Sequence, residues 1–378
     1  MARYDFISTH EVQGMLPVLK DGKWGLVSYD DFDKEIVQPT WDTMPEERRG
    51  CVLIQHKGKF GILDSEGNEV LPPLYDNVYV ANPNRIVIER ADEKYAIFDM
   101  KGNAGIPFKS GYNLLDYHED KRIIAYRNGK CAVIDITEKE IIQFGLYDQI
   151  SWDDSEKMYC VSVNGKEGAL NEQGKEIIPP SMDKIYFYPN DILVKNNGKM
   201  GVYSYTGECK IACNEYSFIT PYGEATFNVS KDGVLYGIIS AKNEVIVPIK
   251  YNKAHRFING FAEVELYEKK GFVNYIGEEI CKIIHNEVRR FSEGLAAVCF
   301  DDAWGVINTE GQPVVEYKYD DIGSFHNGYA IVKLGSKYSV IDKEGNELLP
   351  FIYTSIRTGN VPGEFFVEVD FNEGRVRL

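Results

Sequence analysis

Histidine and cysteine are the side chains here best suited to metal or nucleophile chemistry, and their spacing favours neither. No two histidines stand at metal-ligand spacing, and the His-Glu-x-x-His pattern is absent. Cys209 and Cys213 are spaced like half of a zinc site, but no second half lies nearby. We therefore expect structural or solvated roles and no bound metal. The histidines are His10, His56, His118, His255, His285 and His326.

Motifs that mark common enzyme classes are also missing. The sequence has no Gly-x-Ser-x-Gly, no phosphate-binding Gly-x-x-x-x-Gly-Lys-Ser/Thr and no dinucleotide fingerprint. The segment Asp64–Gly67 resembles a calcium loop, but it lacks the regular acidic alternation and the closing Glu, so a hairpin turn explains it better. The sequence predicts a protein that is not an enzyme, without catalytic, cofactor-binding or metal-binding residues and without a cofactor.

A Tyr-Asp pair recurs along the chain, as at Tyr75-Asp76 and Tyr319-Asp320. It would suit sugar binding, with an aromatic ring beside a carboxylate. We favour a structural corner instead, because the pair keeps a fixed position in a repeat whereas a ligand site would occur in a few units. In that corner the tyrosine packs over the glycine of a neighbouring unit, such as Gly61, and the aspartate bonds backbone amides.

The repeat is defined by an aromatic residue followed by glycine. Ten such positions, some with substitutions, follow one another at intervals of 33 to 36 residues. Glycine lets another backbone approach closely, and the aromatic side chain is expected to bury a large area. If Trp24 or Trp304 is buried, replacement by alanine would cost about 3–5 kcal/mol. The pairs begin at Trp24-Gly25, Phe60-Gly61, Tyr95-Ala96, Cys131-Ala132, Glu167-Gly168, Met200-Gly201, Tyr236-Gly237, Lys270-Gly271, Trp304-Gly305 and Tyr338-Ser339.

Turn signals flank each pair. Asp21-Gly22, Lys57-Gly58 and Asn197-Gly198 precede it and predict type I′ hairpins, whose two central residues need positive φ. A polar residue followed three positions later by glycine comes after it, as at Asp64 to Gly67 and Asp342 to Gly345. A third strand follows, and we expect proline to end it by removing a ladder donor.

Each unit is therefore three strands with apolar side chains on both faces, and it must stack on its neighbours. We predict an all-β tandem array of about ten three-stranded units, forming an open β-solenoid or superhelix. A β-propeller-like ring is the alternative, although propellers use four to eight blades of typically four strands. Residues 1–17 would be an N-terminal cap, 18–360 the ten repeats, and 361–378 a C-terminal capping hairpin.

The segments "GKWGLV", "GKFGILDSEGNEVLPPLYDNV" and "AWGVINTEGQPVVEYKYDDI" resemble the Trp-Gly (WG) repeat family of β-repeat proteins. The resemblance covers roughly residues 18–360, and it departs from the pattern at Cys131, Glu167 and Lys270, where the aromatic residue is lost. It implies a repeat scaffold, often bacterial, and it transfers no catalytic residues.

Charge and composition limit the partners. Lys and Arg number 42 against 58 Asp and Glu, a net charge of −16, which repels nucleic acid and anionic membranes. No apolar run approaches the 18 residues of a membrane span. The seven irregularly spaced cysteines favour reduced thiols in the cytoplasm, with a secreted form whose signal has been removed as the alternative.

We therefore expect a non-enzymatic scaffold that binds a protein partner through an extended acidic surface. The alternative is a carbohydrate-binding or glycan-processing protein, suggested by 25 tyrosines and paired acids. Aromatic side chains gathered in one exposed groove would favour the alternative. Function would otherwise lie in the charged segments 41–51, 117–122 and 267–271, since loops on a rigid scaffold commonly make contacts.

Overall fold

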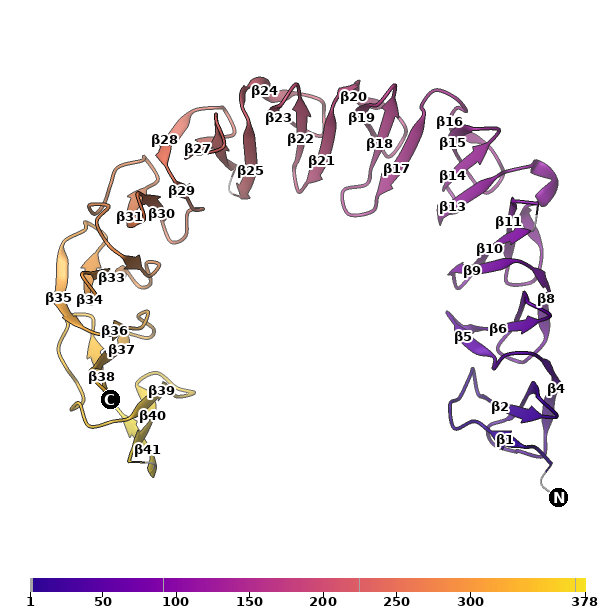
Figure 1. Cartoon of the computed structure of the whole chain (residues 1–378), viewed down its shortest axis with the longest axis horizontal. Helices are drawn as coiled ribbons and strands as arrows, with labels where there is room; N and C mark the ends of the chain where they lie inside the picture. Colours follow the sequence, from indigo (N-terminus) through magenta and orange to yellow (C-terminus); the bar gives the residue numbers. More distant parts are fainter. Residues whose placement is uncertain (1–2, 91, 224, 371) are drawn as a thin grey trace. The chain divides into compact units, whose positions relative to one another are not determined.

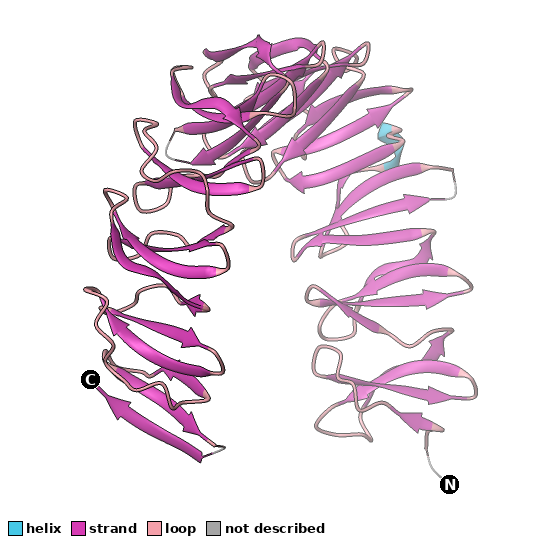
Figure 2. Ribbon diagram, turned by 60° about the vertical axis from the view of Figure 1, so that its left-hand side comes forward, coloured by secondary structure: helices cyan, strands magenta, loops and turns pink. Residues whose placement is uncertain are grey.

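The computed structural model describes residues 3–90, 92–223, 225–370 and 372–378, and these form an all-β tandem array. Eleven antiparallel sheets follow one another along the described residues, eight with four strands and three with three (Figure 2). A 3₁₀ turn, η1 (Phe108–Ser110), interrupts them. The predicted fold class is confirmed. Most sheets have one strand more than expected, because the segment after the Tyr-Asp corner pairs as a further edge strand.

The chain divides into two compact units, Met1–Ser181 and Met182–Leu378, in each of which the sheets follow sequence order (Figure 1). Sheets one to five comprise β1 (Phe6–Ile7), β2 (Met15–Lys20), β3 (Lys23–Ser28), β4 (Glu35–Trp41), β5 (Glu46–Arg48), β6 (Cys51–His56), β7 (Lys59–Leu63), β8 (Glu69–Tyr75), β9 (Asn77–Asn82), β10 (Arg85–Arg90), β11 (Lys94–Asp99), β12 (Ala104–Ile106), β13 (Leu114–Glu119), β14 (Arg122–Arg127), β15 (Lys130–Ile134), β16 (Glu140–Ile142), β17 (Gln149–Asp153), β18 (Met158–Val163), β19 (Lys166–Asn171) and β20 (Glu176–Met182).

Sheets six to eleven comprise β21 (Lys184–Tyr188), β22 (Asp191–Asn196), β23 (Lys199–Tyr203), β24 (Cys209–Tyr216), β25 (Phe218–Gly223), β26 (Thr226–Ser230), β27 (Tyr236–Ser240), β28 (Val245–Tyr251), β29 (Lys253–Ala254), β30 (Phe261–Leu266), β31 (Lys269–Asn274), β32 (Glu287–Val288), β33 (Leu295–Phe300), β34 (Ala303–Asn308), β35 (Pro313–Tyr319), β36 (Asp321–Ile322), β37 (Tyr329–Leu334), β38 (Lys337–Asp342), β39 (Ser355–Thr358), β40 (Glu364–Val369) and β41 (Asn372–Arg377).

The second and third strands of a sheet form the predicted hairpin. In the second sheet, β6 and β7 are joined by Lys57 and Gly58, with φ values of 50° and 75°. Positive φ at both positions is what a type I′ turn requires, so this prediction is confirmed. The third strand carries the aromatic–glycine pair, and its buried residues on both faces pack against the adjoining sheets, as Ile62 does in one cluster and Leu63 in another.

The glycine of the pair is needed because the fourth strand of the same sheet crosses it. In β7 and β8 the register shifts between Phe60 and Ile62, so that the prolines after Leu71 form a bulge. A Cβ added to Gly61 would lie 2.7 Å from the carbonyl oxygen of Leu71 and 2.7 Å from the nitrogen of Pro73. Two expectations are therefore wrong. Proline does not end this strand, and the glycine is covered by its own sheet and not by a neighbouring tyrosine.

Sheets that lack this glycine also lack a full fourth strand. Ala96 and Ala132 occur in sheets whose fourth strands, β12 and β16, have three residues each. Ser339 occurs in the tenth sheet, where two isolated bridges replace that strand. The converse does not hold: the eighth sheet has the glycine, Gly271, but isolated bridges take the place of its fourth strand.

The turn between the third and fourth strands is held by a polar side chain at its first position. The Asp64 carboxylate accepts hydrogen bonds from the backbone N–H groups of Glu66 and Asn68, each at 2.8 Å. Burial opposes ionisation of Asp64, but hydrogen bonds from Asn68, Glu66 and Gly67 outweigh it and hold the pKa below its usual range. The same balance lowers the pKa of the equivalent aspartates Asp99, Asp135 and Asp342.

These four aspartates are expected to make the fold sensitive to acid. A carboxyl group whose pKa is lower in the folded chain stabilises the fold above its unfolded pKa of about 4, and this contribution is lost as the pH falls through the folded pKa. A variant with all four aspartates changed to asparagine should lose less of its thermal stability as the pH falls from about 5 to about 2.

Thermal midpoints measured across that range test this expectation. Asparagine fits the turn, because Asn171 and Asn308 already occupy it and accept the same backbone hydrogen bonds. Equal pH dependence in the variant and the native protein would contradict it.

The aspartate of the Tyr-Asp corner bonds forward into the next sheet. Asp148 accepts a hydrogen bond at 2.6 Å from the backbone N–H of Asn164 in the tight turn between β18 and β19. Asp320 likewise accepts from the N–H of Gly335, whereas Asp76 pairs with the side chain of Lys59. The corner carboxylates are therefore engaged within the scaffold.

The tyrosine of the corner also links successive sheets. The Tyr319 hydroxyl donates to Glu347 Oε1 at 2.8 Å, and the Tyr251 hydroxyl donates to Glu279 Oε1 at 3.1 Å. Both rings are fully buried, whereas Tyr75 is half-buried and stacks on Phe108 with ring centroids 6.0 Å apart.

The aromatic residues of the pair itself are half-buried and not fully buried. This holds for Trp24, Phe60, Tyr236 and Trp304. Trp304 lies in register with Tyr319 across β34 and β35, two residues beyond the tight turn, and is half-buried there.

The terminal segments continue the sheet pattern. Within the segment predicted as an N-terminal cap, β1 pairs with β2 in the first sheet. Within residues 361–378, β40 and β41 form a hairpin, and β40 also pairs with β39, which gives the eleventh sheet.

Candidate binding groove

The sixteen residues that define the repeat are distributed along both units and do not converge on one site. They lie on third strands, in the turns that follow and at corners between sheets. Tyr236 is the one among them that lines a cavity of the groove described below. On third strands lie Trp24, Gly25, Phe60, Gly61, Tyr236, Gly237, Trp304 and Gly305; in turns lie Asp64, Gly67, Asp342 and Gly345; at corners lie Tyr75, Asp76, Tyr319 and Asp320.

A groove lies in the second unit around the seventh and eighth sheets. Three cavities of about 210, 760 and 370 Å³ adjoin there, and Tyr222 lines all three. Arg256 lines the first and second, and His255 lines the first and third. We call them the arginine cavity, the large cavity and the aromatic cavity, and together the Tyr222 groove.

Two copies of one local structure form the arginine cavity. After β29, the segment His255–Gly260 leaves the sheet and returns to β30 through a turn at Asn259 and Gly260, both with positive φ. The segment Arg289–Gly294 does the same between β32 and β33. Arg256 and Arg290 occupy equivalent positions 34 residues apart, so successive repeats direct equivalent arginines into one cavity.

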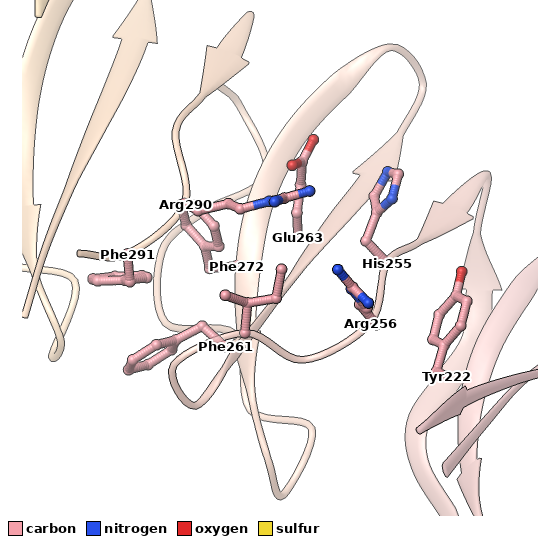
Figure 3. Close-up of a pocket in the computed structure, with 9 residues that line it drawn as sticks. Tyr222, His255, Arg256, Phe261, Glu263, Phe272, Arg290 and Phe291 are labelled. Atoms are coloured by element: carbon pink, nitrogen blue, oxygen red, sulfur yellow. The ribbon is translucent and has the colours of Figure 1, made fainter. Parts of the chain in front are cut away.

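The two copies are fixed to each other. The side-chain amide of Asn259 donates a hydrogen bond at 2.9 Å to the carbonyl oxygen of Phe291. The Phe261 and Phe291 rings pack with centroids 4.1 Å apart, and Phe272 lies 4.9 Å from Phe291. Figure 3 shows these three rings at one end of the cavity and Tyr222 at the other, with the guanidinium groups of Arg256 and Arg290 between them.

Tyr222 is held rigidly between the seventh and eighth sheets. Its hydroxyl donates to the carbonyl oxygen of Ala254 at 2.8 Å, and the buried Asn228 side chain donates to the same oxygen at 2.9 Å. Burial raises the pKa of Tyr222, so it remains a neutral donor.

The aromatic cavity combines rings with polar side chains. It is lined by Phe218, Tyr222 and Tyr236, with Asn228 and Asn252 among its polar groups. Phe218 is 37% exposed, and its ring meets Tyr236 edge to face at 5.6 Å. These partly exposed rings would suit a flat or ring-shaped ligand.

The stretch of sequence that contains the groove has a different net charge from the chain as a whole. Residues 182–300 carry 14 Lys and Arg against 14 Asp and Glu, so this stretch is neutral within a chain of net charge −16. Arg256 and Arg290 are exposed and form no ion pair or hydrogen bond with other described residues. The arrangement can therefore bind and orient a negatively charged group.

Five segments of the chain match the WG containing repeat, over residues 60–82, 236–269, 271–302, 304–338 and 338–358. The chain therefore contains WG repeats. Four of the matched WG segments lie in the second unit, and those beginning at 236 and 271 contribute residues to the arginine cavity.

The solved structures that match this WG-repeat chain have low sequence identity and low TM-scores. The extracellular domain of the hybrid two component system BT3049 from B. thetaiotaomicron is 10% identical, with a TM-score of 0.28, 98% of this chain covered and 64% of that one. A eukaryotic initiation factor is 11% identical, with a TM-score of 0.30 and coverages of 77% and 92%. Hsv2 from Kluyveromyces lactis is 11% identical, with a TM-score of 0.27 and coverages of 80% and 96%.

This chain spans less than two thirds of the BT3049 domain, and similarity at these scores carries nothing about function. A search of curated proteins gave no match to the sequence.

The WG pattern alone does not reveal the groove, because its arginines lie outside the aromatic–glycine pair. The signal that would have found them is a second repeated motif, His-Arg-Phe-Ile-Asn-Gly at 255–260 and Arg-Arg-Phe-Ser-Glu-Gly at 289–294. His255, for which the sequence predicts a structural or solvated role, is exposed and lines two of the cavities.

The three charged segments singled out from the sequence do not line the groove's cavities. Glu46–Arg48 forms β5, residues 117–122 belong to the β13–β14 hairpin, and residues 267–271 form the turn into β31. Within the described ranges, no cluster of three or more His, Cys, Asp or Glu side chains is placed to hold a metal ion. No helix in that part of the chain is long and apolar enough to cross a membrane.

Proposed function

We propose that this WG-repeat chain is a non-enzymatic scaffold that binds a protein partner. The observation that carries the proposal is the series of sheets within each unit, linked by corner hydrogen bonds, which offers a pre-organised surface on that unit at low cost in conformational entropy. Seven free cysteines are in keeping with a reducing, cytoplasmic setting.

The partner would carry a basic surface. Residues 1–100 contain 18 Asp and Glu against 11 Lys and Arg, and residues 301–378 contain 13 against 7. Asp5, Asp21 and Asp30 are among the exposed acids of the first sheet. Because residues 182–300 are neutral, the proposed acidic surface lies on the first sheets and, separately, on the last ones.

Capture of a partner by the immobilised full chain tests this proposal. Binding should be retained at about 0.05 M salt and lost at about 0.5 M, because screening weakens contacts between exposed charges. Asp21→Lys should weaken binding, and lysine fits this turn because Lys57 occupies the equivalent position in the second sheet. Asn197→Lys, at the equivalent turn of the neutral stretch, is the matched control and should bind normally.

Equal effects of the two substitutions, or binding that does not depend on salt, would contradict the acidic-surface proposal.

The aromatic cavity favours a second candidate, a carbohydrate ligand. Phe218, Tyr222 and Tyr236 offer faces for a sugar ring beside the amides of Asn228 and Asn252. The same immobilised protein can be screened against a panel of oligosaccharides. Salt-independent binding that is lost on Phe218→Ser would favour this candidate over the scaffold, and the absence of any bound oligosaccharide would exclude it.

A further inference from the structure

The arginine cavity holds two guanidinium groups, neither of which forms an ion pair with a carboxylate of the described residues. Eight other arginines form ion pairs, whereas Arg256 and Arg290 form none with the described residues. Both come from the same position of successive repeats and line one cavity of about 210 Å³. Guanidinium groups bind carboxylates and phosphates through paired N–H donors, so the cavity is suited to an anion.

The charged side chains that line the arginine cavity would be balanced by one negative charge on a ligand. Glu263 lines the same cavity and offsets one of the two arginines, which leaves an excess of one positive charge. Figure 3 shows the Glu263 carboxylate on the side of the cavity where Arg290 extends. A doubly charged phosphate would be repelled by Glu263 more strongly than a carboxylate would be.

Most of the other residues that line the cavity are apolar or aromatic. Phe261, Phe272 and Phe291 form a packed group of rings at one end, and their edges and faces favour contact with another ring or an aliphatic chain. The volume is below the roughly 300–1,000 Å³ of pockets for drug-sized ligands. The cavity therefore fits a group the size of one side chain or one small organic acid.

We propose that the arginine cavity binds a carboxylate carried on a small aromatic or aliphatic body. Arg256 and Arg290 hold the carboxylate, the three phenylalanine rings contact its apolar body, and Glu263 disfavours more highly charged anions. The carboxylate comes either from an acidic side chain of a protein or from a free organic acid. The proposal rests on this cavity and is independent of the partner that the acidic sheets bind.

Calorimetric titration of the full chain tests the proposal with three probes: phenylacetate, a short neutral-ended peptide containing Phe-Glu, and inorganic phosphate. A carboxylate probe should bind more tightly than phosphate. Arg256→Gln and Arg290→Gln should each weaken it by about tenfold or more, the effect of losing a charged hydrogen bond. Arg377→Gln removes an exposed arginine outside the cavity and is the matched control.

Glu263→Gln supplies a change in the opposite direction, since it should strengthen phosphate binding more than phenylacetate binding. This gain cannot come from misfolding, which would weaken every probe. Tighter binding of the peptide than of phenylacetate would assign the carboxylate to a protein side chain, and the reverse order would assign it to a free acid. The proposal is overturned if neither carboxylate probe binds at about 10 mM, or if Arg290→Gln and Arg377→Gln behave alike.

Discussion

Replacing Gly237 by alanine is expected to destabilise the second unit by about 3 kcal/mol, at the upper end for an overpacked site. The added Cβ would lie 2.5 Å from the carbonyl oxygen of Val247 and 2.9 Å from the backbone nitrogen of Ile249. These are atoms of the bulged fourth strand, β28, which cannot move away without losing its pairing with β27. Urea unfolding of the native and variant chains measures the effect.

Gly323→Ala is the matched control in the same unit. An added Cβ there would lie 3.5 Å from the carbonyl oxygen of Ile331, an ordinary contact, and the backbone does not have positive φ. Its free energy of unfolding should change by less than about 1 kcal/mol. If Gly237→Ala were as mild as Gly323→Ala, the close crossing of β28 over β27 would not be what requires the glycine.

The strand content and the tight turns could be predicted from sequence because they depend on local chemistry. Asp21-Gly22 and Lys57-Gly58 specify positive φ at two adjacent residues, which few other structures need. The crossing of Gly61 by the bulge at Pro73 could not be predicted, because proline by itself indicates a strand end. Only the paired register shows that the strand resumes and reaches Tyr75.

The groove was beyond prediction for a different reason. Arg256 and Arg290 are 34 residues apart, and in sequence they resemble ordinary exposed cations. Their convergence depends on the stacking of successive repeats, which the hydrogen bond from Asn259 to Phe291 fixes. In a repeat protein the same residue position recurs in every repeat. Where two successive repeats direct that position into one cavity, residues outside the aromatic–glycine pair can form a site.

Replacing the corner residue Tyr319 by alanine is expected to cost about 3–5 kcal/mol, more than replacing the signature residue Trp304. Tyr319 is 1% exposed, its ring stacks near Phe351 at 6.1 Å, and its hydroxyl bonds Glu347 in the following repeat. Trp304 is half-buried beside the Arg289 guanidinium, 5.0 Å from its ring, so Trp304→Ala should cost about half as much.

Tyr319→Phe separates the two contributions of the corner residue. It keeps the buried ring and removes the hydroxyl, so it should cost only about 1 kcal/mol, the net value of one hydrogen bond. Glu347 is not left without a partner in this variant, because Lys318 also donates to it at 2.8 Å. Free energies of unfolding from urea titrations of the three variants should therefore rank Tyr319→Ala above Trp304→Ala and Tyr319→Phe last. A larger loss for Trp304→Ala would mean that the signature ring, and not the buried corner, holds successive sheets together.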